Sequence, residues 1–387
     1  PAALLLFPLL AQADPSVTNV RAAQRAGSNL VDIYYNLSGG TPPIDVSVEI
    51  SSDDGATYEV PAASLSGDVG ADVAAGRNRK IVWDAGADWA NQFSARMKVK
   101  IIGSDASGMV LIPAGSFPMG DVFSDDDGDE RPVHTVFVSA FLMDKFEVSK
   151  ALWDEVASWA AANGYDINAA SASGKAANHP VHSLSWYQCV KWCNARSEKE
   201  GLAPCYTVGG VVMKTGTSVA DCSFSANGYR LPTEAEWEKA ARGGLSGKRF
   251  PCGDTINHGY ANYKANGRAF SYDTSPYSTA TYHPAYIDNG FAPFTSPVGS
   301  FAPNGYGVYD MTGNVWEWCN DIYSNTYYPG SPGSNPSGPS SGSARVYRGG
   351  SYTDLANHCR VAARDSLDPS FYVFFVSGFR SARSQGP

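Results

Sequence analysis

Three residues within one stretch of eight could supply oxygen ligands to a hard cation such as calcium. They are Asp310, Gly313 through its carbonyl group, and Glu317. Glu317 lies between Trp316 and Trp318, and on a strand the two tryptophans share one face while the glutamate points the opposite way. Desolvating a carboxylate between large aromatic rings is costly unless a cation or a hydrogen-bond donor meets it. A tryptophan-rich core in which Glu317 pairs with an arginine is therefore the alternative, and the spacing alone favours it.

The cysteines indicate disulfides and structural thiols more than a metal site. No pair has the Cys-x-x-Cys or histidine spacing of a zinc site. In an exported chain, seven cysteines imply some disulfides and one leftover thiol. Cys205 and Cys222 bracket a loop rich in glycine, valine and threonine, and we predict that they are bonded. Cys189 and Cys193 would share one face of a helix, where packing in the core is favoured over a bond.

The composition excludes several classes of protein. The chain has 387 residues, of which 43% are hydrophobic and 17% charged, as is typical of a globular protein with two domains. A net charge of −9 and the lack of a basic cluster argue against a nucleic-acid partner. Abundant glycine, proline, tyrosine and tryptophan favour short strands, tight turns and long loops over helical bundles.

The beginning of the chain has the pattern of a signal peptide. An apolar run, Ala2–Leu10, is followed by Ala11-Gln12-Ala13, which has the small residues of a cleavage site. We therefore expect residues 1–13 to be a signal peptide without its basic start, and the mature protein to be secreted, periplasmic or at the cell surface. The run is too short to span a bilayer, and no later segment is apolar enough, so no transmembrane segment is expected.

Residues 15–104 are predicted to form an all-β sandwich domain without catalytic residues. Apolar and polar residues alternate in Val31–Asn36 and Val46–Ile50, so that one face packs in a core and the other is in water. Turn sequences such as Ser38-Gly39-Gly40 recur at intervals that suit roughly six or seven strands. An immunoglobulin-like or fibronectin-like module is therefore expected, followed by a linker at 103–108.

The candidate cation ligands belong to a second domain that begins near Met109. Lys150–Ala162 and Ser185–Glu200 are predicted to be amphipathic helices. A third helix is predicted to begin after Thr233, which forms a capping box with the glutamate three residues later, and to end at Gly243. The remainder, rich in glycine and proline, is expected to be loops and short strands.

Six motifs of this second domain occur in the order found in the formylglycine-generating enzyme, or sulfatase-modifying factor, family. They are Met109–Gly120, Asp144–Ser149, Gly228–Gly244, Asn304–Trp318, Arg345–Tyr352 and Gly378–Arg380. Over residues 109–384 the chain resembles this family, and the joint occurrence of the motifs is far more specific than any one of them. The resemblance implies an α+β fold, an irregular variant of the C-type lectin fold, with little regular secondary structure and with bound calcium.

Active members of the family hold copper(I) between two cysteine thiolates and use oxygen to convert a sulfatase cysteine into formylglycine. Soft copper(I) selects thiolates, and two of them leave it open to the substrate sulfur. In this chain, Asp354 and Ala356 stand where the family's cysteines are expected, and Cys359 is the one thiol of the segment. We therefore expect Cys359 to be structural, and we expect neither copper nor formylglycine-generating activity. Ser351 and His358 are the remaining polar candidates near the family's active position.

The resemblance favours calcium over a simple core pair at Glu317. The family's calcium near this motif is bound by a side-chain oxygen, two carbonyl groups and a glutamate. The corresponding residues are Asp310, Gly313, Val315 and Glu317. A second calcium position maps onto Asn262, the Tyr263 carbonyl, Asn289 (or Asp288) and the Phe291 carbonyl, and an acidic residue is usual where Asn289 stands. Calcium at either position would hold loops together without taking part in a reaction.

Three functions remain open. The first is an exported, non-catalytic protein that binds a protein or glycan, because the scaffold is kept without the copper pair; exposed aromatic rings could stack on a glycan. The second is an enzyme, either a formylglycine-generating oxidase with rearranged ligands or another chemistry in the same pocket. Two points weigh against an enzyme. Ser351 has no identified base to activate it as a nucleophile, and His358 and His182 are expected to be hydrogen-bonded residues more than catalytic ones. The third is a structural surface component without a ligand.

Overall fold

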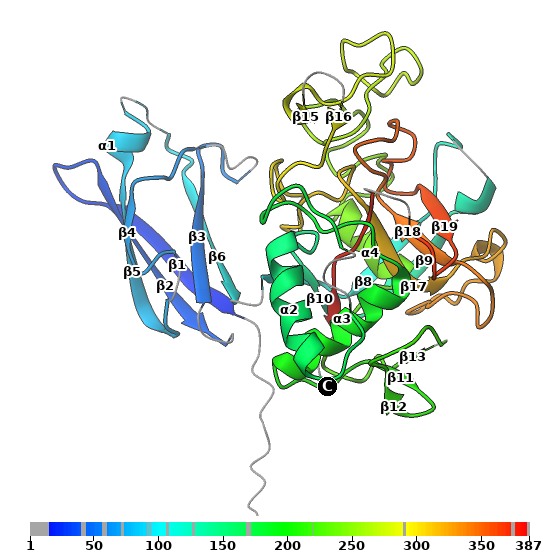
Figure 1. Ribbon diagram of the computed structural model, residues 1–387. Helices are drawn as coiled ribbons and strands as arrows, with labels where there is room; N and C mark the ends of the chain where they lie inside the picture. Colours follow the sequence, from blue (N-terminus) through cyan, green and yellow to red (C-terminus); the bar gives the residue numbers. More distant parts are fainter. Residues whose placement is uncertain are drawn as a thin grey trace, which may run out of the picture. The chain divides into compact units, whose positions relative to one another are not determined.

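The computed structural model describes most of the chain, and its residues fall into two units (Figure 1). The units are Pro1–Met109 and Val110–Pro387. The described residues are 15–39, 44–55, 60–70, 73–90, 92, 94–105, 108–125, 128–167, 172–218, 220–288, 292–372 and 376–384. The predicted signal peptide at 1–13 lies outside them, and they contain no helix that is long and apolar enough to cross a membrane.

The first unit consists of strands and one short helix (Figure 1). One antiparallel sheet has the strand order β1-β2-β5-β4, and a two-stranded sheet pairs β3 with β6. The strands are β1 Ser16–Gln24, β2 Leu30–Ser38, β3 Ile44–Ser51, β4 Leu65–Gly67, β5 Gly76–Asp84 and β6 Lys98–Asp105, and the helix is α1 Ala85–Asp88.

Alternating apolar residues of both sheets form the core of this unit. Ile33 of β2 lies opposite Ile81 of β5, and both are fully buried. Ile50 of β3 and Ile101 of β6 pack in the same cluster. This burial follows from the period of two in strands, which sends every second side chain to one face. The assignment to an immunoglobulin-like or fibronectin-like module stays a prediction.

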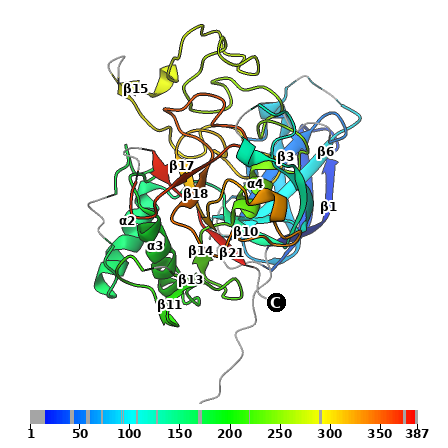
Figure 2. The same ribbon diagram turned by 90° about the vertical axis from the view of Figure 1, so that its right-hand side faces the viewer.

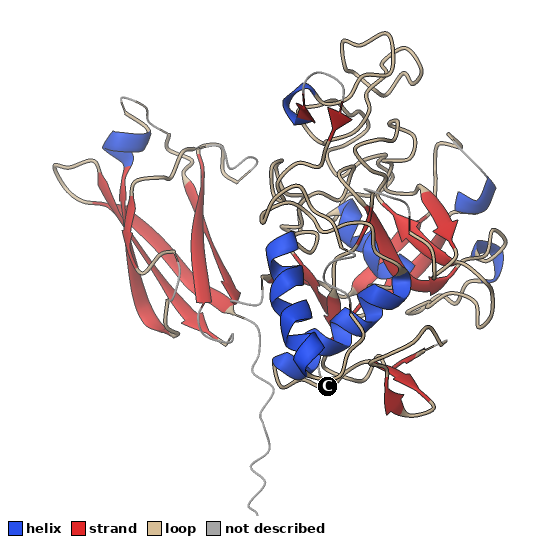
Figure 3. Cartoon of the chain, viewed as in Figure 1, coloured by secondary structure: helices blue, strands red, loops and turns tan. Residues whose placement is uncertain are grey.

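Short strands and loops make up most of the second unit (Figure 3). Its larger sheets have the strand orders β14-β21-β10-β7 and β19-β18-β17-β20. The strands are β7 Met109–Ile112, β8 Gly115–Met119, β9 His134–Val138, β10 Phe141–Asp144, β11 Tyr206–Val208, β12 Val211–Val212, β13 Asp221–Cys222, β14 Tyr229–Arg230, β15 Ile287–Asp288, β16 Ala292–Pro293, β17 Trp316–Ile322, β18 Arg345–Arg348, β19 Arg364–Leu367, β20 Ser377–Gly378 and β21 Ala382–Ser384. Single 3₁₀ turns occupy Gly128–Glu130, Pro284–Tyr286 and Tyr328–Gly330.

The three predicted helices of this unit are confirmed. They are α2 Lys150–Ala162, α3 Trp186–Lys199 and α4 Glu234–Arg242. Helix α4 begins with the predicted capping box, in which the Thr233 hydroxyl accepts from the Glu236 amide, and it ends at Gly243 with φ of 55°. Helices α2 and α3 lie side by side (Figure 2), with Trp153 stacked against Trp192 at a ring separation of 6.0 Å.

The predicted disulfide between Cys205 and Cys222 is wrong, because both residues are free thiols. In the pairing of β11 with β13, Cys222 lies opposite Tyr206, which leaves Cys205 one position out of register. The Cys205 thiol instead donates to the Gly228 carbonyl at 3.3 Å. The predicted packing of Cys189 and Cys193 is confirmed, since both thiols are buried on α3.

Buried ion pairs connect α4 to distant parts of the chain. Glu234 accepts two hydrogen bonds of 2.8 and 2.7 Å from Arg364 of β19. Glu238, which is fully buried, binds Arg242 on its own helix and Arg348 of β18. Burial tends to raise the pKa of Glu238, but the two guanidinium groups outweigh it and hold that pKa below its ordinary value. The helix therefore fixes two strands of one sheet through charges that cannot be left unpaired.

Replacing Glu238 with glutamine should lower the free energy of unfolding by about 3–5 kcal/mol, because two buried guanidinium groups lose their counter-charge. The matched control is Glu155→Gln, which breaks the exposed Glu155–Lys199 pair and should cost less than about 1 kcal/mol. Denaturant unfolding of both variants measures the difference. Equal losses in the two variants would show that the buried pairs do not support the fold.

Candidate functional site

The Trp-Glu-Trp stretch forms the beginning of β17. Trp316 and Trp318 share one face, since both rings pack against Tyr347, at centroid distances of 4.5 and 5.6 Å. Glu317 is buried on the other face, where it accepts hydrogen bonds of 2.7 Å from Nε and from Nη2 of Arg380. Trp237 of α4 also donates to Glu317, at 2.8 Å. The glutamate therefore pairs with an arginine, as in the core interpretation of this stretch.

Two further carboxylates lie close enough to Glu317 for their charges to interact. Glu147 accepts from the Asn314 amide at 2.6 Å and from the Val315 backbone N–H at 3.1 Å. Burial, followed by the charges of Asp310 and Glu317, raises the pKa of Glu147 well above its ordinary value. Neither Glu147 nor Arg380 was predicted for this site. The only signal for them was their position in two of the family motifs.

Asp310 has unused capacity for a ligand. Its Oδ2 accepts from the Gly299 N–H at 2.6 Å, whereas its Oδ1 is buried without a hydrogen-bond partner among the described residues. Burial, with a further contribution from Glu317, raises the pKa of Asp310 to about 6. A buried carboxylate oxygen of this kind is normally satisfied by a donor or by a cation.

The charges of this cluster leave room for a divalent cation. Glu147, Asp310 and Glu317 carry three negative charges when ionised, and Arg380 contributes one positive charge. The cluster then has a net charge of −2, which one divalent cation would neutralise. Among the described residues, no group of three or more His, Cys, Asp or Glu side chains is arranged to hold a metal ion by itself. A calcium ion here would therefore need main-chain oxygens as well, as in the predicted set that includes the carbonyls of Gly313 and Val315.

The second predicted calcium position is only partly described. Asn289 and Phe291 lie outside the described residues. Asn262 is buried and donates through Nδ2 to the Phe294 carbonyl at 3.0 Å, and the Tyr263 carbonyl lies 3.0 Å from Nε2 of His258.

The loop at Asn262 also contacts the first site. The backbone N–H of Asn314 donates to the Asn262 carbonyl at 2.8 Å. Gly313 has φ of 75°, and a Cβ there would lie 2.3 Å from the same carbonyl oxygen, so only glycine fits. The structure thus brings Asn262 and Gly313 together, although they are about fifty positions apart in the sequence.

The two positions predicted to correspond to the family's copper-binding cysteines hold a hydrogen-bonded carboxylate and a buried methyl group. Asp354 accepts from Trp316 Nε1 at 2.8 Å and from the Ser351 hydroxyl. Ala356 is fully buried in a hydrophobic cluster that also contains Cys359. Burial, assisted by the nearby charge of Asp354, raises the pKa of the Cys359 thiol well above its ordinary value. A protonated thiol of this kind is a poor ligand for copper.

His358 contacts Trp316, the same indole that donates to Asp354. Its ring packs edge-on against Trp316, with centroids 6.0 Å apart, and it lines a hollow of about 450 Å³ together with Tyr323, Arg364 and Asp365. Ser351 hydrogen-bonds to Asp354 and, at 2.9 Å, to Thr353. The described hydrogen bonds of Ser351 thus fix a turn and include no histidine that would act as its base.

His182 is a buried histidine within the fold. Its Nδ1 lies 3.2 Å from the Ser183 hydroxyl, and the side chain is 6% exposed. Burial and, to a smaller extent, the neighbouring His179 lower the pKa of His182 to about 4. The ring is therefore neutral at pH 7 and behaves as a hydrogen-bonded core residue.

Comparison with known proteins identifies a matching family and individual relatives. Residues 96–385 match the sulfatase-modifying factor enzyme 1-like domain family. The formylglycine-generating enzyme of Streptomyces coelicolor is 37% identical over 289 residues, which cover 68% of this chain and 85% of that protein. The chaperone protein LppX of Paenibacillus barcinonensis is 29% identical over 67% of this chain and 84% of its own length.

Among solved structures, the chain is similar to Treponema denticola variable protein 1. The TM-score is 0.54 and the identity 32%, over 71% of this chain and 94% of that one.

Replacing His182 with asparagine should reduce the acid sensitivity of the fold. Between about pH 6.5 and pH 4 the unfolded chain protonates this histidine while the folded chain does not, so the free energy of unfolding falls as the pH is lowered. The contribution is at most about 1.4 kcal/mol for each unit of pKa shift. Urea unfolding of both proteins across this range measures it, and an unchanged slope in His182→Asn would contradict it.

Proposed function

This chain belongs to the sulfatase-modifying factor family, and we propose that within this family it is an exported, non-catalytic member that calcium stabilises. Its role would be to bind a protein or glycan, or to form part of a surface scaffold. Export is supported by the signal-peptide pattern at residues 1–13. A binding role is supported by a chain that joins a unit with the family scaffold to a separate strand-rich unit.

One observation supports the proposed absence of oxidase activity. Cys359 is the one thiol after the Gly349-Gly350 turn, and it is buried. The nearby Asp354 accepts hydrogen bonds from Trp316 and Ser351. Linear copper(I) coordination requires two ionised thiolates, and a buried thiol next to a carboxylate resists ionisation. Relatives named as a chaperone and as a variable protein indicate that members of this fold carry different names and roles.

The second candidate function is a formylglycine-generating oxidase. The observation in its favour is the 37% identity with the Streptomyces coelicolor enzyme, over most of that protein. Identity at this level supports the fold and the family, whereas the reaction depends on a few side chains at the site. Since Asp354 and Ala356 are expected at the positions of the family's two cysteines, the non-catalytic function is the stronger proposal.

Calcium at Asp310, Gly313, Val315 and Glu317 is the proposed structural cofactor. Two observations support this calcium site. Oδ1 of Asp310 has no hydrogen-bond partner among the described residues, and the carboxylates around Arg380 carry more negative charge than the arginine can balance. A bound calcium would neutralise this deficit and hold the loop before β17 in place. The position at Asn262 and Tyr263, with Asn289 and Phe291, is proposed as a second calcium site on the family resemblance.

An assay for formylglycine tests the absence of oxidase activity. The chain is incubated with copper(I), oxygen and a Cys-x-Pro-x-Arg peptide, and we expect the peptide mass to stay constant. The Streptomyces coelicolor relative, used as the positive control, should remove about 18 Da, the change from thiol to aldehyde. Formation of the aldehyde by this chain would overturn the proposal.

An Asp354→Cys variant would place a second thiol near Cys359, and it should bind copper(I) more tightly than the wild-type chain does. Competition with a coloured copper(I) chelator measures the affinity. Asp354→Asn is the control, because it removes the carboxylate without adding a ligand. Equal copper binding by all three proteins would show that the pocket does not retain the family geometry.

Calcium should raise the melting temperature of the wild-type chain, and a chelator should lower it again. Saturation at about 100 times the dissociation constant adds about 2.7 kcal/mol to the stability. Asp310→Asn should abolish the shift, whereas Asp154→Asn, which removes a half-exposed carboxylate on α2, should leave it unchanged. A wild-type melting temperature that does not respond to calcium would refute the proposed site.

A further inference from the structure

The loop at residues 310–315, which carries most of the proposed calcium ligands, is hydrogen-bonded to a turn that is distant in the sequence. The backbone N–H of Gly313 donates to the Gly349 carbonyl at 2.8 Å. The backbone N–H of Tyr352 donates to the Asn314 carbonyl at 3.0 Å. The 310–315 loop is therefore fastened at two points to the turn at residues 349–354.

A side chain adds a third connection between the same two segments. Trp316, the residue after the loop, donates through Nε1 to Oδ2 of Asp354 at 2.8 Å, and the Ser351 hydroxyl donates to the same oxygen. The ring of His358 also packs edge-on against Trp316. Asp354 and His358 are both partly exposed, so the position of the Trp316 indole affects residues at the surface of the unit.

The 310–315 loop uses its backbone groups in two directions. The carbonyls of Gly313 and Val315 are proposed calcium ligands, whereas the Gly313 N–H and the Asn314 carbonyl bind the 349–354 turn. Peptide groups are planar, so one Cα atom separates each carbonyl proposed to bind calcium from a peptide group that binds the turn. A rotation of the loop backbone at the cation position therefore disturbs the bonds to the turn directly.

Two features make this loop depend on a cation. Asp310, Gly313 and Asn314 have φ of 55°, 75° and 63°, in the left-handed region, where the backbone needs support from its surroundings. The charge of Glu147 interacts unfavourably with those of Asp310 and Glu317, and Glu147 also accepts from the Val315 N–H at 3.1 Å. Repulsion among the carboxylates therefore acts on the loop itself.

We propose that calcium bound at the 310–315 loop orders the 349–354 turn and the residues that follow it, up to His358. Without the ion, repulsion among the carboxylates loosens the loop, and its three hydrogen bonds to the turn open more often. With the ion, the loop is held and these bonds stay closed. This inference rests on the proposed calcium site and gives that site a regulatory effect on a partly exposed segment.

Hydrogen exchange of the full chain, measured by mass spectrometry with calcium and with a chelator, tests this link. We expect exchange in peptides that cover residues 349–358 to slow at least about tenfold with calcium, because their N–H groups open less often. The hairpin of β11 and β12, residues 206–212 of the same unit, should change less than about twofold. A turn that slows no more than this hairpin would overturn the proposal.

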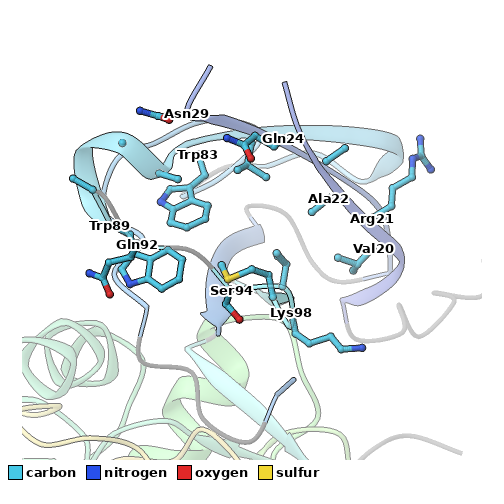
Figure 4. Close-up of a pocket in the computed structure, with 17 residues that line it drawn as sticks. Val20, Arg21, Ala22, Gln24, Asn29, Trp83, Trp89, Gln92, Ser94 and Lys98 are labelled. Atoms are coloured by element: carbon cyan, nitrogen blue, oxygen red, sulfur yellow. The ribbon is translucent and has the colours of Figure 1, made fainter. Parts of the chain in front are cut away.

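The first unit supplies a second reference segment. Strand β5 belongs to that separate unit, and its Trp83 lies with Trp89 beside a hollow there (Figure 4). Exchange in β5 should not respond to calcium. Equal slowing of β5, the hairpin and the turn would show a general effect of the ion and would overturn the specific link.

Two tryptophan variants test the connection through the indole. Trp316→Phe removes the N–H that binds Asp354 and keeps an aromatic ring, so the slowing at residues 353–358 should fall below about threefold. Trp318→Phe is the matched control, because Trp318 donates to the Leu184 carbonyl at 2.9 Å, and it should keep the full slowing. Equal slowing in the two variants would refute the connection through Trp316.

The melting temperature separates this inference from the calcium site on which it rests. A rise in melting temperature with calcium, without slower exchange in the 349–354 turn, would overturn the link and leave the calcium site standing. Neither a rise in melting temperature nor slower exchange would refute both. A rise in melting temperature together with slowing confined to the turn and the residues up to His358 is the expected result.

Discussion

The pairing of buried carboxylates with arginines is the constraint on which the second unit depends. Helix α4 is buried along its length. Its Glu234, Glu236 and Glu238 bind three arginines that belong to the strands β19, β14 and β18, respectively. Long loops form few of the backbone hydrogen bonds that join paired strands, so ion pairs between side chains connect these segments instead. Since a single buried charge is far more costly than a matched pair, each of these contacts holds two segments at a fixed separation.

The candidate calcium site also pairs buried carboxylates with an arginine, but here the carboxylates outnumber the arginine. Arg380 reaches Glu317 through two hydrogen bonds, yet Glu147 and Asp310 add two carboxylates to the same buried region. The arginine pair and a calcium ion are therefore not exclusive interpretations of Glu317. The pair satisfies one carboxylate, and a divalent cation would compensate for the other two.

The segment predicted to correspond to the family's active position is packed and hydrogen-bonded in this structure. Asp354 joins the Trp316 indole to the Ser351 turn, and Cys359 is enclosed in a hydrophobic cluster. These contacts stabilise the segment after β18 without exposing a reactive thiolate. The first unit differs in character, because its core consists of alternating apolar residues from two sheets.

Local patterns in the sequence determined the helices and their ends, because capping boxes and terminal glycines act over a few residues. They also placed Trp316 and Trp318 on one face of a strand and Glu317 on the other. Only the tertiary structure decided what each face meets: Arg380 is 63 positions from Glu317, and the Glu147 hydrogen bond to Asn314 spans 167. The tertiary structure also decided that Cys205 and Cys222 stay free thiols, because the register of the paired strands places Cys222 opposite Tyr206. Residue spacing records contacts within one turn or strand, whereas contacts between distant segments depend on how the whole core packs.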